Sequence, residues 1–497
     1  MSIFRRFFVG AGYSTLTAVV NRIMLAVGSI VFARFLGAAD FGVYVNLIAL
    51  VNLCSVVCLF GVNTAFSSFI PQYNQTQPEK LPAVIVSGLL LNVLFLGVFS
   101  SILLPLANTI SVELYRGQVQ ALYVMMALPW LMGVTMNAST FAALYGFQDF
   151  RHYAAVNLLS GAVVATLTIA GAFLFGLRGI IIGNGIAYGV SVLLALSGLG
   201  RYGLTRMKGW SIHIGASLKE VFRFSLPTFL SGLFVAPAFW VGNFLLVQHG
   251  AVASSGYFGV ANSLAQLVLF IPATMSAPLV PIFSEVSSTE NPERFSELVV
   301  KNVRMIWSVA LPIAAFMGAA AFWLIVLLYG RQYVPSVSTF VVLVVTNLLI
   351  AVESILGYVL IAKKKMWDSF VANFLWFCLF LAFAWFMIRD FDQLGFAMAL
   401  LASYLLYGVV IVVVLKRHIT FSLGTPDFVR AVGFSGLVVG GMVAVVLFVE
   451  SMIPAIALAV LLTSVVVAAE WNFFLSIEER RMLLDLYQQY RVKYLGN

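Results

Sequence analysis

The stretch "TAVVNRIMLAVG", from Thr17 to Gly28, is apolar except for Thr17 and the adjacent pair Asn21 and Arg22. Apolar residues continue on both sides, over residues 8–35, and a membrane-spanning helix needs only about 20 such residues. Arg22 therefore lies near the middle of a predicted membrane helix, where a charge costs at least ~2.5 kcal/mol on insertion scales. Such a residue is expected to have a function or a specific partner.

The composition of the whole chain indicates a lipid environment. The 497 residues are 62% hydrophobic and 9% charged, with a mean hydropathy of +1.02, whereas a soluble protein is about 25% charged. The apolar runs are continuous rather than alternating, which predicts helices and not barrel strands. The first run is too long for a signal peptide, so we expect no cleaved leader. The three cysteines lie in apolar stretches, which argues against a disulfide framework or a zinc cluster.

Runs long enough to cross a bilayer number fourteen, which predicts an all-α polytopic membrane protein. An even number places both termini on the same side. The predicted spans cover residues 8–35, 42–70, 83–106, 120–146, 154–175, 180–200, 221–248, 256–284, 303–328, 338–362, 369–388, 395–415, 429–449 and 453–474.

The distribution of lysine and arginine indicates on which side of the membrane the two termini lie. With the amino terminus in the cytoplasm, the inner segments contain 21 of the 28 basic residues, the outer loops contain five, and Arg22 and Arg223 lie within spans. Cytoplasmic loops carry such an excess of positive charge. We therefore expect both termini in the cytoplasm, and we attribute the net charge of +9 to membrane orientation and anionic lipids rather than to nucleic acid.

An internal repeat relates the two halves of the spans. "GFQDFRHYAAVN", ending at Asn157, matches "AKKKMWDSFVAN", ending at Asn373, at an offset of 216 residues. The same offset relates Gly179 to Gly395, and an earlier pair beginning at Gly37 and Gly250 has an offset of 213. Parallel repeats of this kind are typical of transporters. We expect two pseudo-symmetric six-helix lobes, related by an axis along the membrane normal, that enclose a cavity.

The predicted domain organisation follows from the spans and the repeat. It consists of a first lobe (1–200), a cytoplasmic linker (201–220), a second lobe (221–420), a helix pair (421–475) and an amphipathic cytoplasmic tail (476–497).

Several stretches resemble a known family. "VFARFLGAADFGVY" (Val31 to Tyr44), "FSLPTFLSGL" (Phe224 to Leu233) and "GYFGVANSLAQL" (Gly256 to Leu267) are similar to helices one to two, seven and eight of polysaccharide transporters. That family is a branch of the multidrug/oligosaccharidyl-lipid/polysaccharide flippase superfamily. The resemblance covers about residues 1–420. It implies alternating access in a bacterial cytoplasmic membrane and export of undecaprenyl-pyrophosphate-linked O-antigen, capsule or exopolysaccharide units.

Arg22 is the first candidate for contact with such a substrate, because guanidinium binds phosphate oxygens bidentately and stays charged. The alternative is an arginine that joins two helices through backbone carbonyls. Asn21, Asn137 and Asn243 are amides that could bind sugar hydroxyls, although intramembrane amides also join helices. Arg34 is either a gate charge or an interface anchor. Arg223 is either an anchor or a substrate ligand.

Glu353 is the candidate for ion coupling. It lies in the middle of the predicted span 338–362, and the offset of 216 relates it to Asn137. A buried carboxyl group could bind a proton or help to bind sodium. The alternative is a glutamate that pairs with Arg22 or with a hydroxyl group.

Competing functions remain open at this point. A multidrug and toxin exporter shares the two-lobe plan but normally has twelve spans, whereas a lipid II flippase has fourteen. A membrane glycosyltransferase or polymerase is a distant alternative, since "DFD" (Asp390 to Asp392) lies in an outer loop that lacks nucleotide sugars. We expect no catalytic residue, no metal and no cofactor beyond a coupling H⁺ or Na⁺. The expected partners are the lipid-linked oligosaccharide, membrane lipids and a polysaccharide polymerase or chain-length machinery.

Overall fold

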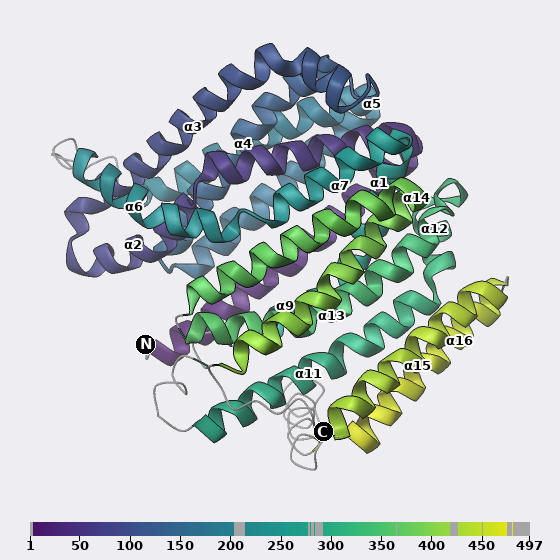
Figure 1. The fold of residues 1–497 in the computed structure, drawn as a ribbon. Helices are drawn as coiled ribbons and strands as arrows, with labels where there is room; N and C mark the ends of the chain where they lie inside the picture. The colour runs from purple at the N-terminus through teal and green to yellow at the C-terminus, as the bar shows by residue number, and fades with distance from the viewer. Residues whose placement is uncertain are drawn as a thin grey trace, which may run out of the picture. The chain divides into compact units, whose positions relative to one another are not determined.

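The computed structural model describes residues 3–202, 214–276, 279, 283, 292–363, 365–417, 426–449, 451–474 and 480. All regular elements in this described part are helices (Figure 1). Ten helical segments within it are long and apolar enough to cross a membrane. The prediction of an all-helical membrane protein is therefore confirmed. Most of the predicted linker (201–220) and almost all of the predicted tail (476–497) lie outside the described residues.

The first half of the chain forms long helices, two of which contain a break. Gly37 (φ 77°) interrupts α1, and Gly176 (φ 60°) interrupts α5. The left-handed region suits glycine because it has no Cβ. In chain order the elements are α1 (Ile3–Leu59), α2 (Val62–Thr76), η1 (Pro78–Lys80), α3 (Leu81–Thr109), η2 (Ile110–Leu114), α4 (Ala121–Gly146) and α5 (Phe150–Gly200).

The second half contains more breaks between helices. Asp392 (φ 48°) interrupts α14 in the way that Gly176 interrupts α5. The elements are α6 (Ile214–Gly232), α7 (Val235–His249), α8 (Val252–Ala265), η4 (Gln266–Leu269), α9 (Phe270–Ser276), α11 (Pro292–Ala319), α12 (Ala321–Tyr329), η5 (Arg331–Tyr333), α13 (Ser336–Ala362), α14 (Met366–Leu415), α15 (Pro426–Phe448), α16 (Met452–Ala469) and η6 (Glu470–Phe474).

The offset of 216 residues recurs in the structure. Adding 216 to the bounds of α4 gives 337–362, beside 336–362 for α13, and adding it to α5 gives 366–416, beside 366–415 for α14. The break at Gly176 maps to Asp392, with ψ of −136° and −128°. A Cβ atom on Gly179 would lie 1.9 Å from the Gly171 carbonyl oxygen, and one on Gly395 would lie 1.9 Å from the equivalent Met387 oxygen. Both breaks therefore lead into the same close packing of two helix halves.

The predicted span 42–70 differs most from the structure. The helix that contains its first part begins directly after Gly37, and Phe60 and Gly61 then separate α1 from α2, which continues to Thr76. Both residues have positive φ angles, 47° and 75°. The continuous apolar run concealed this break, because hydropathy reports burial in lipid and is insensitive to local backbone conformation.

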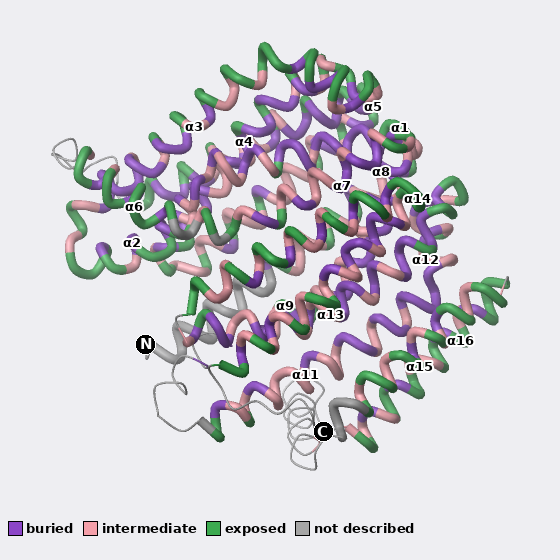
Figure 2. The backbone as a smooth tube through the Cα atoms, in the orientation of Figure 1, coloured by how far each residue is buried: buried purple, intermediate pink, exposed green. Residues whose placement is uncertain are grey.

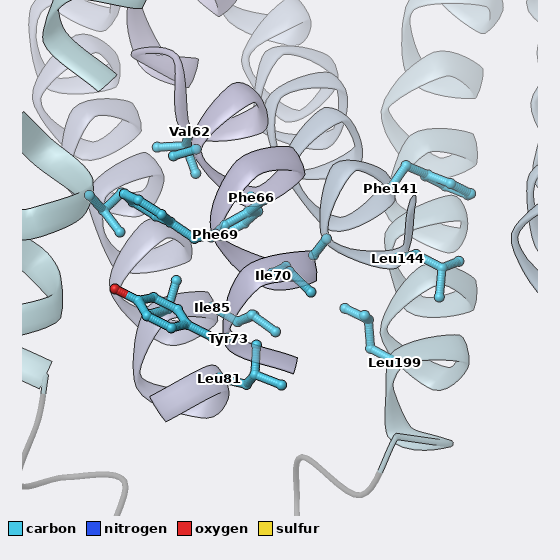
Figure 3. Close-up of a cluster of buried hydrophobic side chains, with 14 of the residues drawn as sticks. Val62, Phe66, Phe69, Ile70, Tyr73, Leu81, Ile85, Phe141, Leu144 and Leu199 are labelled. Atoms are coloured by element: carbon cyan, nitrogen blue, oxygen red, sulfur yellow. The ribbon is translucent and has the colours of Figure 1, made fainter. Parts of the chain in front are cut away.

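The chain divides into two compact units. The first comprises Met1–Ser263 and Phe377–Ala399. It contains a buried apolar cluster in which α2 contributes Val62, Phe66 and Ile70, and in which Leu144 of α4 and Leu199 of α5 also take part (Figure 3). α6 also contributes to this cluster, through Val221.

The second unit comprises Leu264–Trp376 and Leu400–Asn497. Within it, Trp307 of α11 donates a hydrogen bond from Nε1 to Oγ of Ser435 in α15, at 3.0 Å. Ala319, the last residue of α11, and Ala320, which precedes α12, share a buried cluster with Ala459 of α16. Most residues of α15 and α16 are nevertheless exposed or only partly buried (Figure 2). An apolar helix pair with so much exposed surface is suited to contact with lipid.

Candidate functional site

Asn21 takes part in a chain of polar side chains that joins α1 to α5. Its Nδ2 donates a hydrogen bond to Oδ1 of Asn157 at 2.5 Å, and Nδ2 of Asn157 donates to the hydroxyl of Tyr153 at 3.3 Å. Gly161 makes this approach possible, because a Cβ atom there would lie 2.2 Å from Oδ1 of Asn21. That oxygen is buried and has no hydrogen-bond donor in the described part of the chain. It is therefore an available acceptor beside Arg22.

Arg22 follows Asn21 in α1 and is half-buried. The next residue, Ile23, is 56% exposed, so this level of α1 has one face in the protein and one face outside it. Arg22 thus combines a position deep in an apolar helix with an amide network on the adjacent residue. Contact of Arg22 with a substrate stays a prediction.

Asn137 belongs to a second network, between α4 and both halves of α5. Its Oδ1 accepts a hydrogen bond from the hydroxyl of Ser191, which in turn bonds to the hydroxyl of Ser160. Ser160 and Ser191 are buried and lie on opposite sides of the break at Gly176. The network therefore fixes the α5 hairpin against α4, which favours the helix-joining interpretation of Asn137.

Glu353 occupies the equivalent position in α13, in the second unit. It is 8% exposed, and its Oε2 makes no hydrogen bond to the described residues. Its Oε1 lies against α14, where a Cβ atom on Gly408 would be 2.6 Å away. Tyr404 and Tyr407 of α14 are close enough to interact electrostatically with Glu353. The predicted mid-span carboxyl group is thus buried against α14.

The remaining candidates lie elsewhere. Arg34 is exposed, directly before the break at Gly37, and Arg223 is exposed on α6. Asn243 is buried in α7, where its Nδ2 donates to the carbonyl oxygen of Phe239 at 2.9 Å. Its Oδ1 has no hydrogen-bond donor in the described part of the chain. The substrate roles of these three residues stay predictions.

Sequence reasoning did not single out Asn92, which is completely buried in α3. Its Nδ2 donates to the carbonyl oxygens of Cys58 and Leu59 at 2.8 and 3.2 Å, and its Oδ1 accepts from the hydroxyl of Ser139 at 2.6 Å. A lone amide in the apolar run 83–106 was the available signal.

Comparisons with known proteins agree with this architecture. Residues 31–338 match the family described as "Polysaccharide biosynthesis protein". The lipid III flippase of Escherichia coli K12 is 24% identical over 397 residues, which cover 77% of this chain and 91% of the relative.

Two solved structures have a similar fold. One is a lipid II flippase, MurJ, in an inward closed conformation, with a TM-score of 0.70, 13% identity and coverage of 93% of this chain and 98% of the other. The other is an inward-facing multidrug resistance transporter of the MATE family, with a TM-score of 0.66, 14% identity and coverage of 85% and 98%. The latter is described as a member of the MOP superfamily.

The family match spans more than half of the chain, and the two solved structures have a similar fold. The chain therefore belongs to the polysaccharide biosynthesis protein family.

Proposed function

We propose that this protein is a flippase that moves undecaprenyl-pyrophosphate-linked oligosaccharides across a bacterial cytoplasmic membrane by alternating access. Family membership supports the class of transporter, and the lipid III flippase relative supports a lipid-linked oligosaccharide as substrate. The observation that carries the proposal is the position of Arg22, half-buried in a long apolar helix beside the chain from Asn21 to Asn157. A permanent cation with adjacent amides suits a substrate that combines pyrophosphate with sugar hydroxyls.

Fourteen spans are part of this proposal. Three of the ten apolar segments, Thr17–Leu59, Phe150–Gly200 and Met366–Leu415, have 43, 51 and 50 residues, about twice the length that a single span needs. Each of the three contains a break with positive φ. Counting each as a hairpin gives thirteen spans, and α6 with α7 supplies one more. The lobe boundaries at 1–200 and 221–420 and the cytoplasmic location of both termini belong to the same proposal.

In this scheme Arg22 binds the pyrophosphate and Asn21 accepts a hydrogen bond from a sugar hydroxyl. Asn137 and Asn243, with Arg34 and Arg223, are secondary candidates along the path. Glu353 couples the cycle to a gradient of H⁺ or Na⁺, and the chain carries no enzymatic activity. A polysaccharide polymerase or chain-length machinery would act on the exported unit.

The test uses Arg22→Ala and Arg22→Lys in cells that lack the endogenous protein. A hydrogen bond to a charged group is worth about 1.5–3 kcal/mol, so Arg22→Ala should lower export of surface polysaccharide about tenfold or more at normal expression. Arg22→Lys keeps the charge and should retain part of the export. Wild-type surface polymer in the alanine variant would remove Arg22 from the mechanism.

A transport assay with the purified protein in liposomes distinguishes between the competing classes of transporter. A flippase of this class should translocate undecaprenyl-pyrophosphate oligosaccharide. Selective translocation of lipid II would instead favour the peptidoglycan branch, and efflux of small cations without lipid flipping would favour a multidrug exporter.

A further inference from the structure

The break between α1 and α2 places Phe60 beside α6. Phe60 has a left-handed φ of 47°, a strained conformation for a bulky residue, and Gly61 follows with 75°. The carbonyl groups that end α1, those of Cys58 and Leu59, receive hydrogen bonds from Nδ2 of Asn92. An end of a helix that is buried in this way needs such donors. The break is therefore supported by a neighbouring helix on the α1 side.

Beyond the break, α2 contacts α6 through aromatic rings. The ring of Phe60 stacks on Phe95 of α3 at 4.8 Å and on Phe222 and Phe229 of α6, both at 5.0 Å. Phe69 of α2 lies 4.8 Å from Phe224 of α6. Phe222 and Phe224 remain 39% and 36% exposed. This aromatic seam is thus only partly enclosed on its α6 side. It consists of Phe60 with Phe95, Phe222 and Phe229, and of the pair Phe69 and Phe224.

Near its carboxyl-terminal end, α2 is joined to α6 by a polar contact. The hydroxyl of Tyr73 donates a hydrogen bond to Oε1 of Glu220 in α6, and Nζ of Lys80 lies 5.8 Å from the tyrosine ring. In Figure 3 this hydroxyl points away from the apolar cluster. Burial, followed by the bond to Glu220, raises the pKa of Tyr73 to about 12, so the phenol stays a donor at physiological pH. Glu220 is exposed, so water can compete for this bond.

We propose that α2 and α6 form a gate that opens when α6 moves away from α2, and that the Tyr73–Glu220 bond and the aromatic seam hold this gate closed. The opposite face of α2 is buried against α4 and α5, so α6 is the element that moves. This inference rests on the proposed transport function. The distribution of lysine and arginine places this end of the helices on the cytoplasmic side, where a lipid-linked substrate would enter. α2 and α6 belong to different predicted repeats, and relative movement of the two repeats is what alternating access requires.

The native Cys58 provides a probe that needs no substrate. It is fully buried two residues before Phe60, on whose ring Phe222 and Phe229 of α6 stack, so separation of α6 from α2 should expose its thiol. In a Cys54→Ala, Cys378→Ser background, labelling by N-ethylmaleimide should be roughly two- to tenfold faster in Tyr73→Phe and in Glu220→Gln, the range that loss of one hydrogen bond allows. The first control is Tyr123→Phe, in the first turn of α4. The second is Glu79→Gln, which removes an exposed carboxylate near the gate. Unchanged labelling in both gate variants, or an equal increase in the controls, would overturn the proposal.

A cross-link provides the second measurement. Tyr73→Cys with Glu220→Cys, in a background that lacks Cys54, Cys58 and Cys378, should be joined by a bifunctional methanethiosulfonate reagent and lose export, and reduction should restore it. If the cross-linked protein exports at the same rate as the reduced protein, α2 and α6 do not separate during transport. That result would overturn the gate and leave the flippase proposal intact. Failure of the flippase proposal would instead appear as absent flipping in the wild type, with the labelling of Cys58 unaffected.

Discussion

Glu353 and Asn137 show how one position in a repeated structure can carry different chemistry. The amide of Asn137 accepts a hydrogen bond from Ser191, and the offset of 216 maps Ser191 to Tyr407. The hydroxyl of Tyr407 instead donates to Oδ1 of Asn373 at 3.3 Å, and Oε2 of Glu353 has no donor among the described residues. A neutral amide suits a fixed structural network, whereas an unsatisfied buried carboxyl group is suited to binding a cation or a proton.

This difference predicts that Glu353→Gln uncouples transport from the ion gradient. Coupling energies of about 1–3 kcal/mol correspond to a stimulation of roughly 5- to 150-fold. In proteoliposomes, an imposed H⁺ or Na⁺ gradient should accelerate flipping by the wild type and should have little effect on Glu353→Gln. Glu470→Gln is the matched control, because Glu470 is also a buried carboxyl group, at 4% exposure. Unaltered gradient dependence in Glu353→Gln would count against its role, and an equal loss in the control would indicate a general effect.

At the scale of the helix, the two equivalent breaks use different residues. Gly176 and Asp392 have nearly the same backbone angles, but only glycine adopts them without strain. Asp392 therefore stores strain that Gly176 avoids. Its Oδ1 lies beside Gly250, where a Cβ atom would be 2.6 Å away, so the carboxylate is positioned against the loop between α7 and α8.

We expect Asp392→Gly to stabilise the protein by ~1 kcal/mol, because a residue in a sparsely populated backbone conformation costs about 1–3 kcal/mol. Asp390→Gly is the matched control. Asp390 is exposed within α14 and has no positive φ, so glycine there should destabilise by about 0.5–1 kcal/mol. SDS titration in mixed micelles would measure both free energies of unfolding. Destabilisation by Asp392→Gly would show that the contact near Gly250 outweighs the strain.

The sequence predicted the helices better than their breaks. The predicted spans 120–146 and 338–362 differ from α4 and α13 by two residues or fewer at either end, because a long apolar run has few alternatives in lipid. The break at Phe60 was missed because neither the apolar run nor the type of residue at position 60 marks it. The contact between Asn21 and Asn157 was also beyond prediction, since it depends on how α1 packs against α5 near Gly161. Single polar residues were found, but their partners required the tertiary structure.

At the scale of the molecule, the distribution of lysine and arginine is the main argument for the orientation of the chain in the membrane. The two repeats begin on the same side of the membrane only if the first contains an even number of spans. The breaks at Gly37, Gly176 and Asp392 are therefore essential to the topology, since each converts one long helix into a hairpin in the proposed scheme. If each of these three long segments crossed the membrane once as a straight helix, the part of the chain after the first break would lie on the opposite side from the one proposed.

The proposed topology can be tested at two exposed positions that flank α3. Glu79 lies in η1, on the predicted cytoplasmic side, and Gln120 directly precedes α4, on the predicted outer side. In a Cys378→Ser background, a membrane-impermeant maleimide should label Gln120→Cys in intact cells and should label Glu79→Cys only after permeabilisation. Cys378→Ser alone is the control, because Cys54 and Cys58 are buried. Labelling of Glu79→Cys in intact cells, with Gln120→Cys protected, would show that the orientation is inverted and that the gate between α2 and α6 lies on the outer side. Equal labelling of both variants in intact cells would mean that α3 does not span the membrane, and the fourteen-span scheme would be wrong.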